Sequence, residues 1–235
     1  MYRFVQCAAV AAMMLAGSAQ ATNLVQNGSF ESGLANWTIG GADNGSTKYP
    51  PAAIFYNSAS AYPIGAFGEA VTPDNSVSAS PDAVGSRAAY FVSDFAVNQS
   101  LSQSIFLASG VYKIGFSAYA PLNGFRNAGD ATFSGAIAGV QLANYAVSEG
   151  QPRVWQAFSA EKTVNSGSLF DISFVFNTNR FPSKDVVIDR VFITRIGDVT
   201  TNAVPEPSSW AMLLAGFGLV GLMSRRSKRV TVVAA

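Results

Sequence analysis

Apolar and polar residues alternate in short runs through the middle of the chain. Ile172, Phe174 and Phe176 share one face of such a run, with Asp171 and Ser173 on the other, which is the period of a half-buried strand. No apolar stripe of helical period runs through this region. Many short strands separated by turn signals predict an all-β fold, a β-sandwich. The predicted strands are Ala88–Phe95, Gln99–Leu107, Val111–Tyr119, Ala131–Leu142, Trp155–Lys162, Leu169–Asn177 and Val186–Ile196.

A long stretch, residues 40–85, interrupts this strand pattern. It is rich in Ala, Ser, Gly and Pro, and it offers a single predicted strand, Ile54–Tyr56. A long irregular insertion in a compact domain is usually functional or lacks fixed structure. Two interpretations remain open: a lid or binding loop, or a passive excursion of the chain. The aromatic residues that a binding loop would offer are Tyr49, Tyr56, Tyr62 and Phe67.

The first 21 residues have the layout of a secretory signal peptide. One cation, Arg3, precedes an apolar run from Val5 to Ala16, and the small-residue site Ala19-Gln20-Ala21 follows. We expect cleavage after this site, which leaves an exported β-sandwich domain over residues 22–197. Cys7 lies inside the removable segment and far from the cut, which argues against a lipoprotein anchor.

The C-terminal end of the chain is a polar linker, a short apolar segment and a basic tail. The linker covers residues 198–209, and the stretch Trp210–Met223 after it contains 14 residues without a charge. A helix of that length spans about 21 Å, less than the roughly 30 Å core of a bilayer. Taken alone, the stretch would suit a buried core helix or an interfacial segment. Four cations follow directly, in agreement with the positive-inside rule, so we predict a single transmembrane helix with its basic tail over residues 210–229.

A tripeptide in the linker belongs to a candidate sorting motif. Pro205-Glu206-Pro207 is followed by Trp210-Ala211, then by the apolar segment and the basic cluster Arg225-Arg226-Ser227-Lys228-Arg229. This order resembles the PEP-CTERM sorting tail of Gram-negative bacteria, in its PEPxxWA variant. The resemblance implies that the chain has an exosortase, a membrane enzyme that processes the tail, as its partner. It also implies a chain that is anchored in the membrane first and then passed to the cell surface or extracellular matrix.

Composition and charge exclude several classes of protein. Residues 22–204 hold ten Lys or Arg and thirteen Asp or Glu, a net charge of −3 without a basic patch, which argues against a nucleic-acid partner. The chain has no histidine, and its one cysteine lies in the signal peptide. These absences exclude disulfides, zinc sites built on His or Cys, Ser-His-Asp triads and Cys-His pairs from the exported domain.

Two short motifs carry a resemblance to a known fold family. The opening run Asn23–Glu31, followed by Trp37, is similar to the first strand of galactose-binding-like jelly-roll domains, which include carbohydrate-binding modules of the CBM4/9 type. The closing run Val187–Ile193 looks like their last strand, with Arg190 in place of the usual second acid. The resemblance implies a jelly-roll β-sandwich whose first and last strands are neighbours.

The same resemblance implies a structural calcium ion and no other cofactor. Glu31 and Asp189 are the acids at the matching positions, and backbone carbonyls would complete the six to eight oxygen ligands that calcium prefers. The alternative is that Glu31 caps a turn and that Asp189 pairs with Arg190 or Arg195 at the surface.

Sugar binding has two sets of candidate residues. We also predict that Gln99–Leu107 and Val111–Tyr119 form a hairpin through a turn at Ser109-Gly110. The loop after it combines an aromatic ring, an amide and a cation at Tyr119, Asn123 and Arg126, groups that stack on and hydrogen-bond to a sugar. The alternative is an ordinary glycine turn. Trp37 and Trp155 would serve either as stacking platforms or as core residues.

Three classes of function remain. We expect a non-catalytic carbohydrate-binding domain at the cell surface that engages polysaccharide or biofilm; a structural surface protein without a specific ligand and a glycan-active enzyme are the alternatives. An enzyme is disfavoured because Asp185 and Asp189, the only close acidic pair in a predicted strand, would lie about 13 Å apart along it. Glycosidases use roughly 5–10 Å. Acids distant in the sequence could still converge.

Overall fold

The computed structural model describes residues 22–199 together with residues 212, 214, 215 and 217. It divides into two compact units, Met1–Asp198 and Val199–Ala235. Residues 212, 214, 215 and 217 of the second unit are helical and exposed, and no helix in the described part of the chain is long and apolar enough to cross a membrane. The predicted signal peptide, residues 1–21, lies outside the described residues. So do most of the predicted transmembrane segment, the basic tail, and the sorting-motif residues Pro205, Glu206, Pro207, Trp210 and Ala211.

Residues 22–198 of the first unit contain ten strands and two short helical turns. Its strands are β1 (Thr38–Asp43), β2 (Ala52–Phe55), β3 (Arg87–Phe91), β4 (Ala96–Leu107), β5 (Gly110–Tyr119), β6 (Ala131–Ile137), β7 (Val140–Ala146), β8 (Gln156–Val164), β9 (Ser168–Thr178) and β10 (Val186–Gly197). Its helical turns are α1 (Leu122–Phe125) and the 3₁₀ turn η1 (Val147–Glu149).

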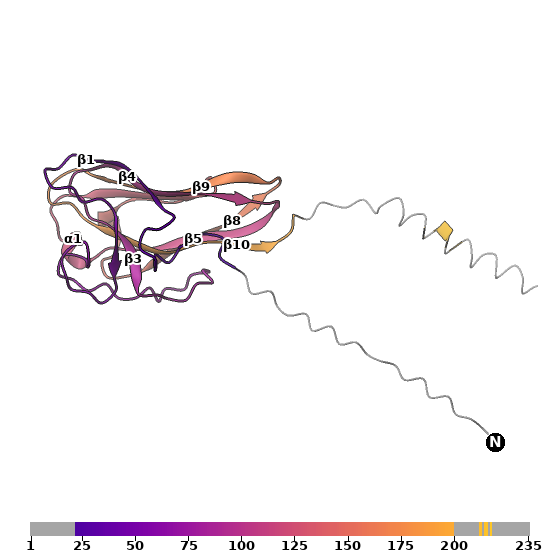
Figure 1. Ribbon diagram of the computed structural model, residues 1–235, viewed down its shortest axis with the longest axis horizontal. Coiled ribbons are helices and arrows are strands. Elements are labelled where there is room, and N and C mark those ends of the chain that lie inside the picture. Colours follow the sequence, from indigo (N-terminus) through magenta and orange to yellow (C-terminus); the bar gives the residue numbers. More distant parts are fainter. Residues whose placement is uncertain (1–21, 200–211, 213, 216, 218–235) are drawn as a thin grey trace, which may run out of the picture. The chain divides into compact units, whose positions relative to one another are not determined.

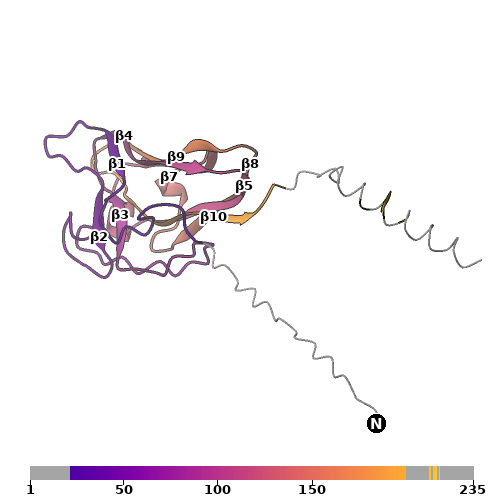
Figure 2. The ribbon, with the colours of Figure 1, turned by 45° about the vertical axis from the view of Figure 1, so that its right-hand side comes forward.

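The strands form a sandwich of two five-stranded antiparallel sheets (Figures 1 and 2). One sheet has the order β1-β4-β9-β6-β7, and the other has the order β2-β3-β10-β5-β8. Consecutive strands from β3 to β10 lie in opposite sheets, except for β6 and β7, which are neighbours in one sheet. The eight strands therefore have the orders β3-β10-β5-β8 and β4-β9-β6-β7. This interleaving is the topology of an eight-stranded jelly roll. The predicted all-β jelly-roll sandwich is confirmed.

The hairpin of β6 and β7 corrects the sequence prediction, which placed a single strand over residues 131–142. Ile137 pairs with Val140, so only two residues form the turn between the strands. Those residues, Ala138 and Gly139, have φ angles of 51° and 76°. Positive φ at both central positions is the geometry that reverses a strand most tightly. The second strand was missed because alanine gives little sequence signal for that conformation.

The opening segment also differs from its prediction, because it is a series of turns and not a strand. Only Asn23 forms a ladder bridge, to Thr194 of β10. Asn27 and Phe30 have φ angles of 52° and 56°, which break an extended conformation. The segment nevertheless lies beside the last strand, since the Val191 N–H donates to the Gly28 carbonyl at 2.9 Å. The predicted neighbourhood of the two ends of the domain is therefore confirmed, without a regular first strand.

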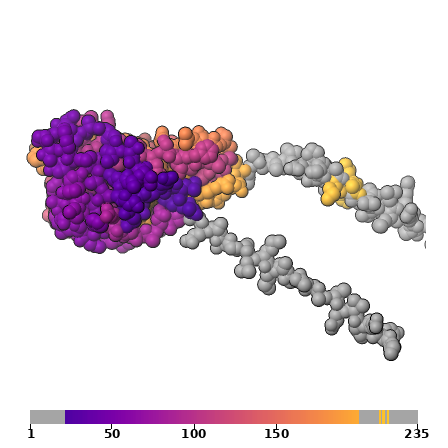
Figure 3. Space-filling model, viewed as in Figure 1, coloured from indigo at the N-terminus to yellow at the C-terminus, as the bar shows by residue number. Residues whose placement is uncertain are grey.

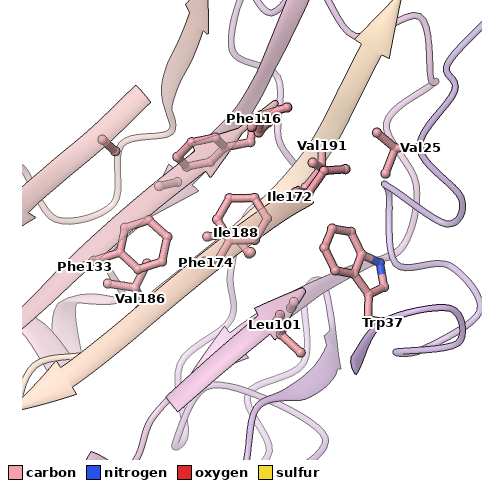
Figure 4. Close-up of a cluster of buried hydrophobic side chains, with 14 of the residues drawn as sticks. Val25, Trp37, Leu101, Phe116, Phe133, Ile172, Phe174, Val186, Ile188 and Val191 are labelled. Atoms are coloured by element: carbon pink, nitrogen blue, oxygen red, sulfur yellow. The ribbon is translucent and has the colours of Figure 1, made fainter. Parts of the chain in front are cut away.

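The interior of the sandwich is a cluster of phenylalanine and branched aliphatic side chains from both sheets (Figure 4). Phe174 of β9 lies at its centre, with ring centroids 4.9 Å from Phe116 and 6.2 Å from Phe133. Trp37, which follows the opening turns, closes this cluster at 6.0 Å from Phe174. Every other residue of β9 faces this core, as the alternation of its sequence predicts.

A second hydrophobic cluster lies on the outer face of the sheet that contains β3. Successive β3 residues alternate between the two clusters: Ala89 and Phe91 point into the sandwich, and Ala88 and Tyr90 point outward. The irregular segment between β2 and β3 covers this outer face, and the first third of the chain forms much of the visible surface around it (Figure 3). The other members of the cluster are Ile54, Tyr56, Ala66, Val71, Val92, Tyr119, Trp155 and Val187. Much of the insertion is therefore the cover of a second core.

Candidate functional site

A cavity of about 430 Å³ opens at the end of the sandwich where α1 lies, on the left in Figure 1. Four connections between strands form its walls, namely those that follow β1, β2, β3 and β9, together with α1. Loops at one end of a rigid sandwich are where binding residues commonly gather. The lining residues are Ser46, Thr47, Tyr49, Phe67, Val92, Asp94, Phe95, Asn123, Gly124, Asn127, Phe181, Pro182 and Asp185.

Aromatic rings form two walls of the cavity. Phe95 and Phe181 stack with their centroids 5.9 Å apart and their planes 11° from parallel. Their side chains are 44% and 64% exposed, respectively, so both rings present apolar surface to solvent. A second pair of lining rings, Tyr49 and Phe67, meets edge to face at 6.1 Å. Exposed rings held rigidly against each other are suited to stack on the apolar face of a ligand.

A buried carboxylate, Asp185, lies at the floor of the cavity. It is only 4% exposed, and its Oδ2 accepts a hydrogen bond of 2.6 Å from the Tyr90 hydroxyl. Burial raises the pKa of Asp185 to about 7, and the like charge of Asp94 adds to the rise. The α1 turn can approach this carboxylate because residue 124 is glycine. A Cβ atom there would lie 2.1 Å from Asp185 Oδ2.

Asp94 is a second carboxylate in the same cavity. Its Oδ1 accepts a 2.5 Å hydrogen bond from the Ser183 backbone N–H, which ties the β3–β4 connection to the β9–β10 connection. Burial raises the pKa of Asp94, the Ser183 hydrogen bond opposes this rise, and the charge of Asp43 reinforces it. Both carboxylates of the cavity are therefore more easily protonated than an exposed aspartate.

Hydrogen bonds hold the walls in place. The Asp43 carboxylate accepts from the backbone N–H groups of Gly45 and Tyr49 and from the Ser93 hydroxyl. Burial raises the pKa of Asp43, but these three hydrogen bonds outweigh it and leave the pKa below its ordinary value. On the opposite wall, buried Glu69 accepts 2.7 Å from the Asn123 N–H and pairs with Arg153 at 2.6 Å. The loops of the cavity are therefore ordered by charge-assisted contacts before a ligand arrives.

Of the three sugar-binding candidates predicted on the loop after β5, the structure places one in the cavity. Asn123 lines it, and the Asn123 Nδ2 donates to the Phe67 carbonyl at 3.2 Å. Tyr119 is 3% exposed and packs 5.1 Å from Trp155 in the second core, so its ring cannot stack on a ligand. Arg126 is exposed but lies outside the lining. The insertion covers the face on which Tyr119 lies, and the sequence did not show that cover.

The two tryptophans of the sandwich domain, Trp37 and Trp155, are core residues. This is the second of the two interpretations that the sequence left open. Trp37 and Trp155 are each 8% exposed. The Trp37 Nε1 donates to the Asn27 carbonyl at 3.1 Å, and the Trp155 Nε1 donates to the Thr72 carbonyl at 2.8 Å. A buried indole with a satisfied N–H fills a core and offers no platform to a sugar.

Sequence reasoning missed the residues that shape the cavity most. Phe95, Phe181, Asp94 and Asp185 come from two connections that are far apart in the chain. The available signal was local: each connection places an aspartate and a phenylalanine within a few residues of a strand end. Sequence alone does not say which connections meet at one end of a sandwich.

Glu31 ties the opening turns to the start of β3. Its Oε1 accepts 2.7 Å from the Ser86 N–H and 2.8 Å from the Arg87 N–H, while its Oε2 accepts 2.7 Å from the Ser86 hydroxyl. Glu31 therefore caps a loop, as the alternative interpretation proposed. Both of its oxygens already have protein donors, which a calcium ion would have to share or displace.

Asp189 is fully buried in β10, which rules out the surface ion pair that the sequence offered as an alternative. Its Oδ2 accepts from the Tyr56 hydroxyl, and its Oδ1 accepts 2.7 Å from the Arg190 N–H. Burial raises the pKa of Asp189 well above its ordinary value, and the charges of Asp74 and Glu31 add to this. Within the described residues, no three acidic side chains gather as a metal centre. Calcium at Glu31 and Asp189 stays a prediction.

Comparison with known proteins identifies the tail. The PEP-CTERM protein-sorting motif matches residues 203–229, which include the tripeptide, the apolar segment and the basic cluster. This motif indicates export and sorting to the cell envelope. A comparison with curated protein sequences finds no match.

Solved structures similar to the first unit are carbohydrate-binding modules. A CBM61 module in complex with β-1,4-galactotriose is 19% identical with a TM-score of 0.44, over 74% of this chain and 99% of that one. A family 16 module is 14% identical with a TM-score of 0.39, over 73% and 99%. The CBM22-1 xylan-binding domain of Paenibacillus barcinonensis Xyn10C is 13% identical with a TM-score of 0.39, over 77% and 97%. At these identities the likeness concerns the fold alone; the chain carries a PEP-CTERM sorting motif behind a jelly-roll domain.

Proposed function

We propose that this chain is an exported, surface-sorted protein whose jelly-roll domain binds a glycan without transforming it. The observation that carries the proposal is the cavity at the α1 end of the sandwich, where aromatic walls stand over carboxylate and amide groups. Sugar rings have apolar faces and hydroxyl edges, so they suit a site that combines stacking surfaces with a few fixed polar groups. The cavity of about 430 Å³ has the size of a small-ligand site and suits a short glycan segment.

The sorting motif supports a location for this binding domain outside the cytoplasm. An exosortase-type enzyme would be its processing partner, with the predicted membrane segment holding the chain until processing. We propose that the domain then acts at the surface of a Gram-negative cell and engages polysaccharide of the extracellular matrix or biofilm. A reporter that is active only outside the cytoplasm, fused after residue 204, should be active in the producing cell. An inactive fusion of this kind would contradict export.

A glycan-active enzyme is the alternative that the cavity brings closer, because Asp94 and Asp185 converge there from distant parts of the chain. Glycosidases divide their two carboxylates into a protonated acid and an ionised partner by environments that move the two pKa values apart. In this cavity burial raises the pKa of both carboxylates. The direction of the shift is the same for both carboxylates and assigns neither role. We favour binding over catalysis because the exported domain has no histidine to act as a general base near neutral pH and no cysteine to act as a nucleophile.

A glycan array probed with the full-length chain in mild detergent tests the proposal. Phe181→Ala removes a wall of the cavity and should weaken binding to any array hit by at least about tenfold, the effect of a central aromatic contact. Phe106→Ala is the matched control, since Phe106 is also an exposed phenylalanine, at 61%, but lies on β4 outside the cavity. Equal loss in both variants would show that the cavity is not the site.

Two other outcomes separate the alternatives. Silence across a broad array would favour a structural surface protein without a specific ligand. Sustained release of sugar from a bound polysaccharide, abolished by Asp185→Asn, would establish an enzyme in place of a binding protein.

A further inference from the structure

The charge of the cavity restricts what it can bind. Its lining contains two carboxylates, Asp94 and Asp185, and no lysine or arginine. Two ion pairs are found among residues 22–199, Arg153 with Glu69 behind a wall of the cavity and Arg195 with Asp198, and none of these four residues is part of the lining. Neither cavity carboxylate has a cationic partner in the described part of the chain.

Two neighbouring lysines are engaged elsewhere, and neither lines the cavity. Lys184 precedes Asp185, but its Nζ donates to the carbonyls of Phe125 at 2.6 Å and Asn127 at 2.9 Å. Its ammonium also lies 4.9 Å from the centre of the Phe125 ring. Lys48, in the loop after β1, donates to the Asp43 carbonyl.

Each cavity carboxylate keeps one oxygen free for a ligand. Asp185 uses Oδ2 to accept from Tyr90, and Asp94 uses Oδ1 to accept from Ser183. Neither Asp185 Oδ1 nor Asp94 Oδ2 accepts a hydrogen bond from any described residue. Asp185 is 96% buried, and the little surface it retains belongs to a residue of the cavity lining. Asp185 Oδ1 is not among the fully buried side-chain atoms that lack a partner, so this oxygen is accessible and open to a donor in the cavity.

We propose that the ligand is a cationic glycan, in which a sugar with a free ammonium group donates to Asp94 and Asp185 while its ring stacks between the aromatic walls. This inference rests on the proposed glycan-binding function and adds the charge class of the ligand. An ammonium group has three N–H donors and no acceptor, which matches free carboxylate oxygens. Aromatic faces also attract cations. Uronic acids would instead place a negative charge beside two others, which is a means of rejecting a wrong ligand.

A metal ion is a poorer match to the same observations. A divalent cation of the calcium type takes six to eight oxygen ligands. The described residues hold no group of three acidic side chains that could bind one, and four of the thirteen lining residues are aromatic. Aromatic walls contribute to the binding of an organic cation and not to that of a bare metal ion.

The test uses matched oligosaccharides and the full-length chain in detergent, with binding measured by calorimetry at neutral pH. In both the gluco and the galacto series, the amino-sugar oligomer is compared with its N-acetylated and hydroxyl counterparts, and galacturonate oligomers represent the anionic class. We expect the amine form of at least one series to bind about tenfold or more tightly than both neutral counterparts, which corresponds to roughly 1.4 kcal/mol. Galacturonate should not bind.

Variants assign this preference to the cavity. Asp94→Asn and Asp185→Asn keep an oxygen for Ser183 and Tyr90 but remove the charge, so each should reduce the amine preference to about twofold or less. Asp171→Asn, which removes an exposed charge on β9, should leave it unchanged. Thermal unfolding of each variant checks that the domain is intact.

The possible failures are distinguishable. Neutral oligomers that bind as tightly as amines, with binding lost in Phe181→Ala, would overturn the charge class and leave the glycan-binding proposal standing. An amine preference that survives both Asp→Asn variants, or binding that requires an added divalent cation, would also overturn it. If no oligomer binds and the glycan array is silent, both proposals fall.

Discussion

Asp185 makes a prediction about stability that needs no ligand. Asp185→Asn removes the charge of the carboxylate but keeps a carbonyl oxygen at nearly the same place, so the Tyr90 hydroxyl keeps its acceptor. The side chain is 4% exposed, and its surroundings in the cavity floor are unchanged by the substitution. The variant therefore isolates the free energy of placing an ionised carboxylate in this position.

The sign follows from where the proton is bound. Burial raises the pKa of Asp185 from 3.8 to about 7 in the folded protein. Between these two values the folded state holds the proton more tightly than the unfolded state does, so stability falls as pH rises through this window and is constant above it. At 1.36 kcal/mol for each pH unit, the wild type loses roughly 4 kcal/mol of unfolding free energy by this route. The asparagine variant loses none of it.

Urea unfolding of both proteins at a series of pH values from about 4 to 8 measures the difference. All other titrating groups are shared, so the stability of Asp185→Asn minus that of the wild type should rise with pH across this range and then level off. Asp171→Asn, at an exposed position on β9, is the matched control variant. A difference for Asp185→Asn that does not change with pH would refute the argument that burial holds this carboxyl protonated.

Two further predictions concern the core and the calcium question. Phe174→Ala should lower the unfolding free energy by about 3–5 kcal/mol, because the fully buried ring leaves a cavity, whereas exposed Phe106→Ala should change it by less than about 0.5 kcal/mol; equal effects in urea unfolding would contradict the assignment of the core. Glu31→Ala should cost about 1–3 kcal/mol because it removes three hydrogen bonds to the start of β3. If Glu31 and Asp189 also bind calcium, a chelator should lower the melting temperature of the wild type. It should have little effect on the melting temperature of Glu31→Ala. An unchanged melting temperature of the wild type would mean that Glu31 only caps the loop.

The sandwich could be predicted because its strands report their buried face in the sequence. The alternation around Phe174 in β9 is the clearest case, and the structure buries those alternate residues. β1 was missed because its centre, Gly40-Gly41, gives no pattern of apolar and polar side chains. In β10 the apolar runs at Val186–Ile188 and Val191–Ile193 are nearly continuous, and nine of its residues in a row are buried. A continuous apolar strand indicates that both faces of its sheet are buried. The sequence of β10 therefore indicated the second hydrophobic cluster, which a search for alternating residues alone does not detect.

The cavity could not be predicted in the same way, because it depends on which loops meet. Asp94 and Asp185 are separated by most of the domain, and only the jelly-roll order brings the β3–β4 and β9–β10 connections to one end. Asn123 was found because its loop follows a recognisable strand, β5. The hairpin predicted from Gln99–Leu107 and Val111–Tyr119 is wrong, because β4 and β5 belong to different sheets. Tyr119, the last residue of β5, was misplaced, since its exposure depends on the insertion that covers it. Local pattern predicts strands, whereas sites made of several connections require the topology first.

Asp185 links the stability of the domain to its proposed function. If its role were to accept the Tyr90 hydrogen bond, asparagine would serve as well and would spare the folded protein the cost of a buried charge at neutral pH. The charge is the one property that asparagine lacks. Exposed stacked rings at Phe95 and Phe181 are likewise a feature that a domain with no ligand does not need. Groups that cost stability in the free protein and converge on one cavity are expected where a site is built for a ligand, because function and stability compete there. The same reasoning explains why a cation is the missing partner: it would favour the ionised form of Asp185 and offset the cost that the free domain bears.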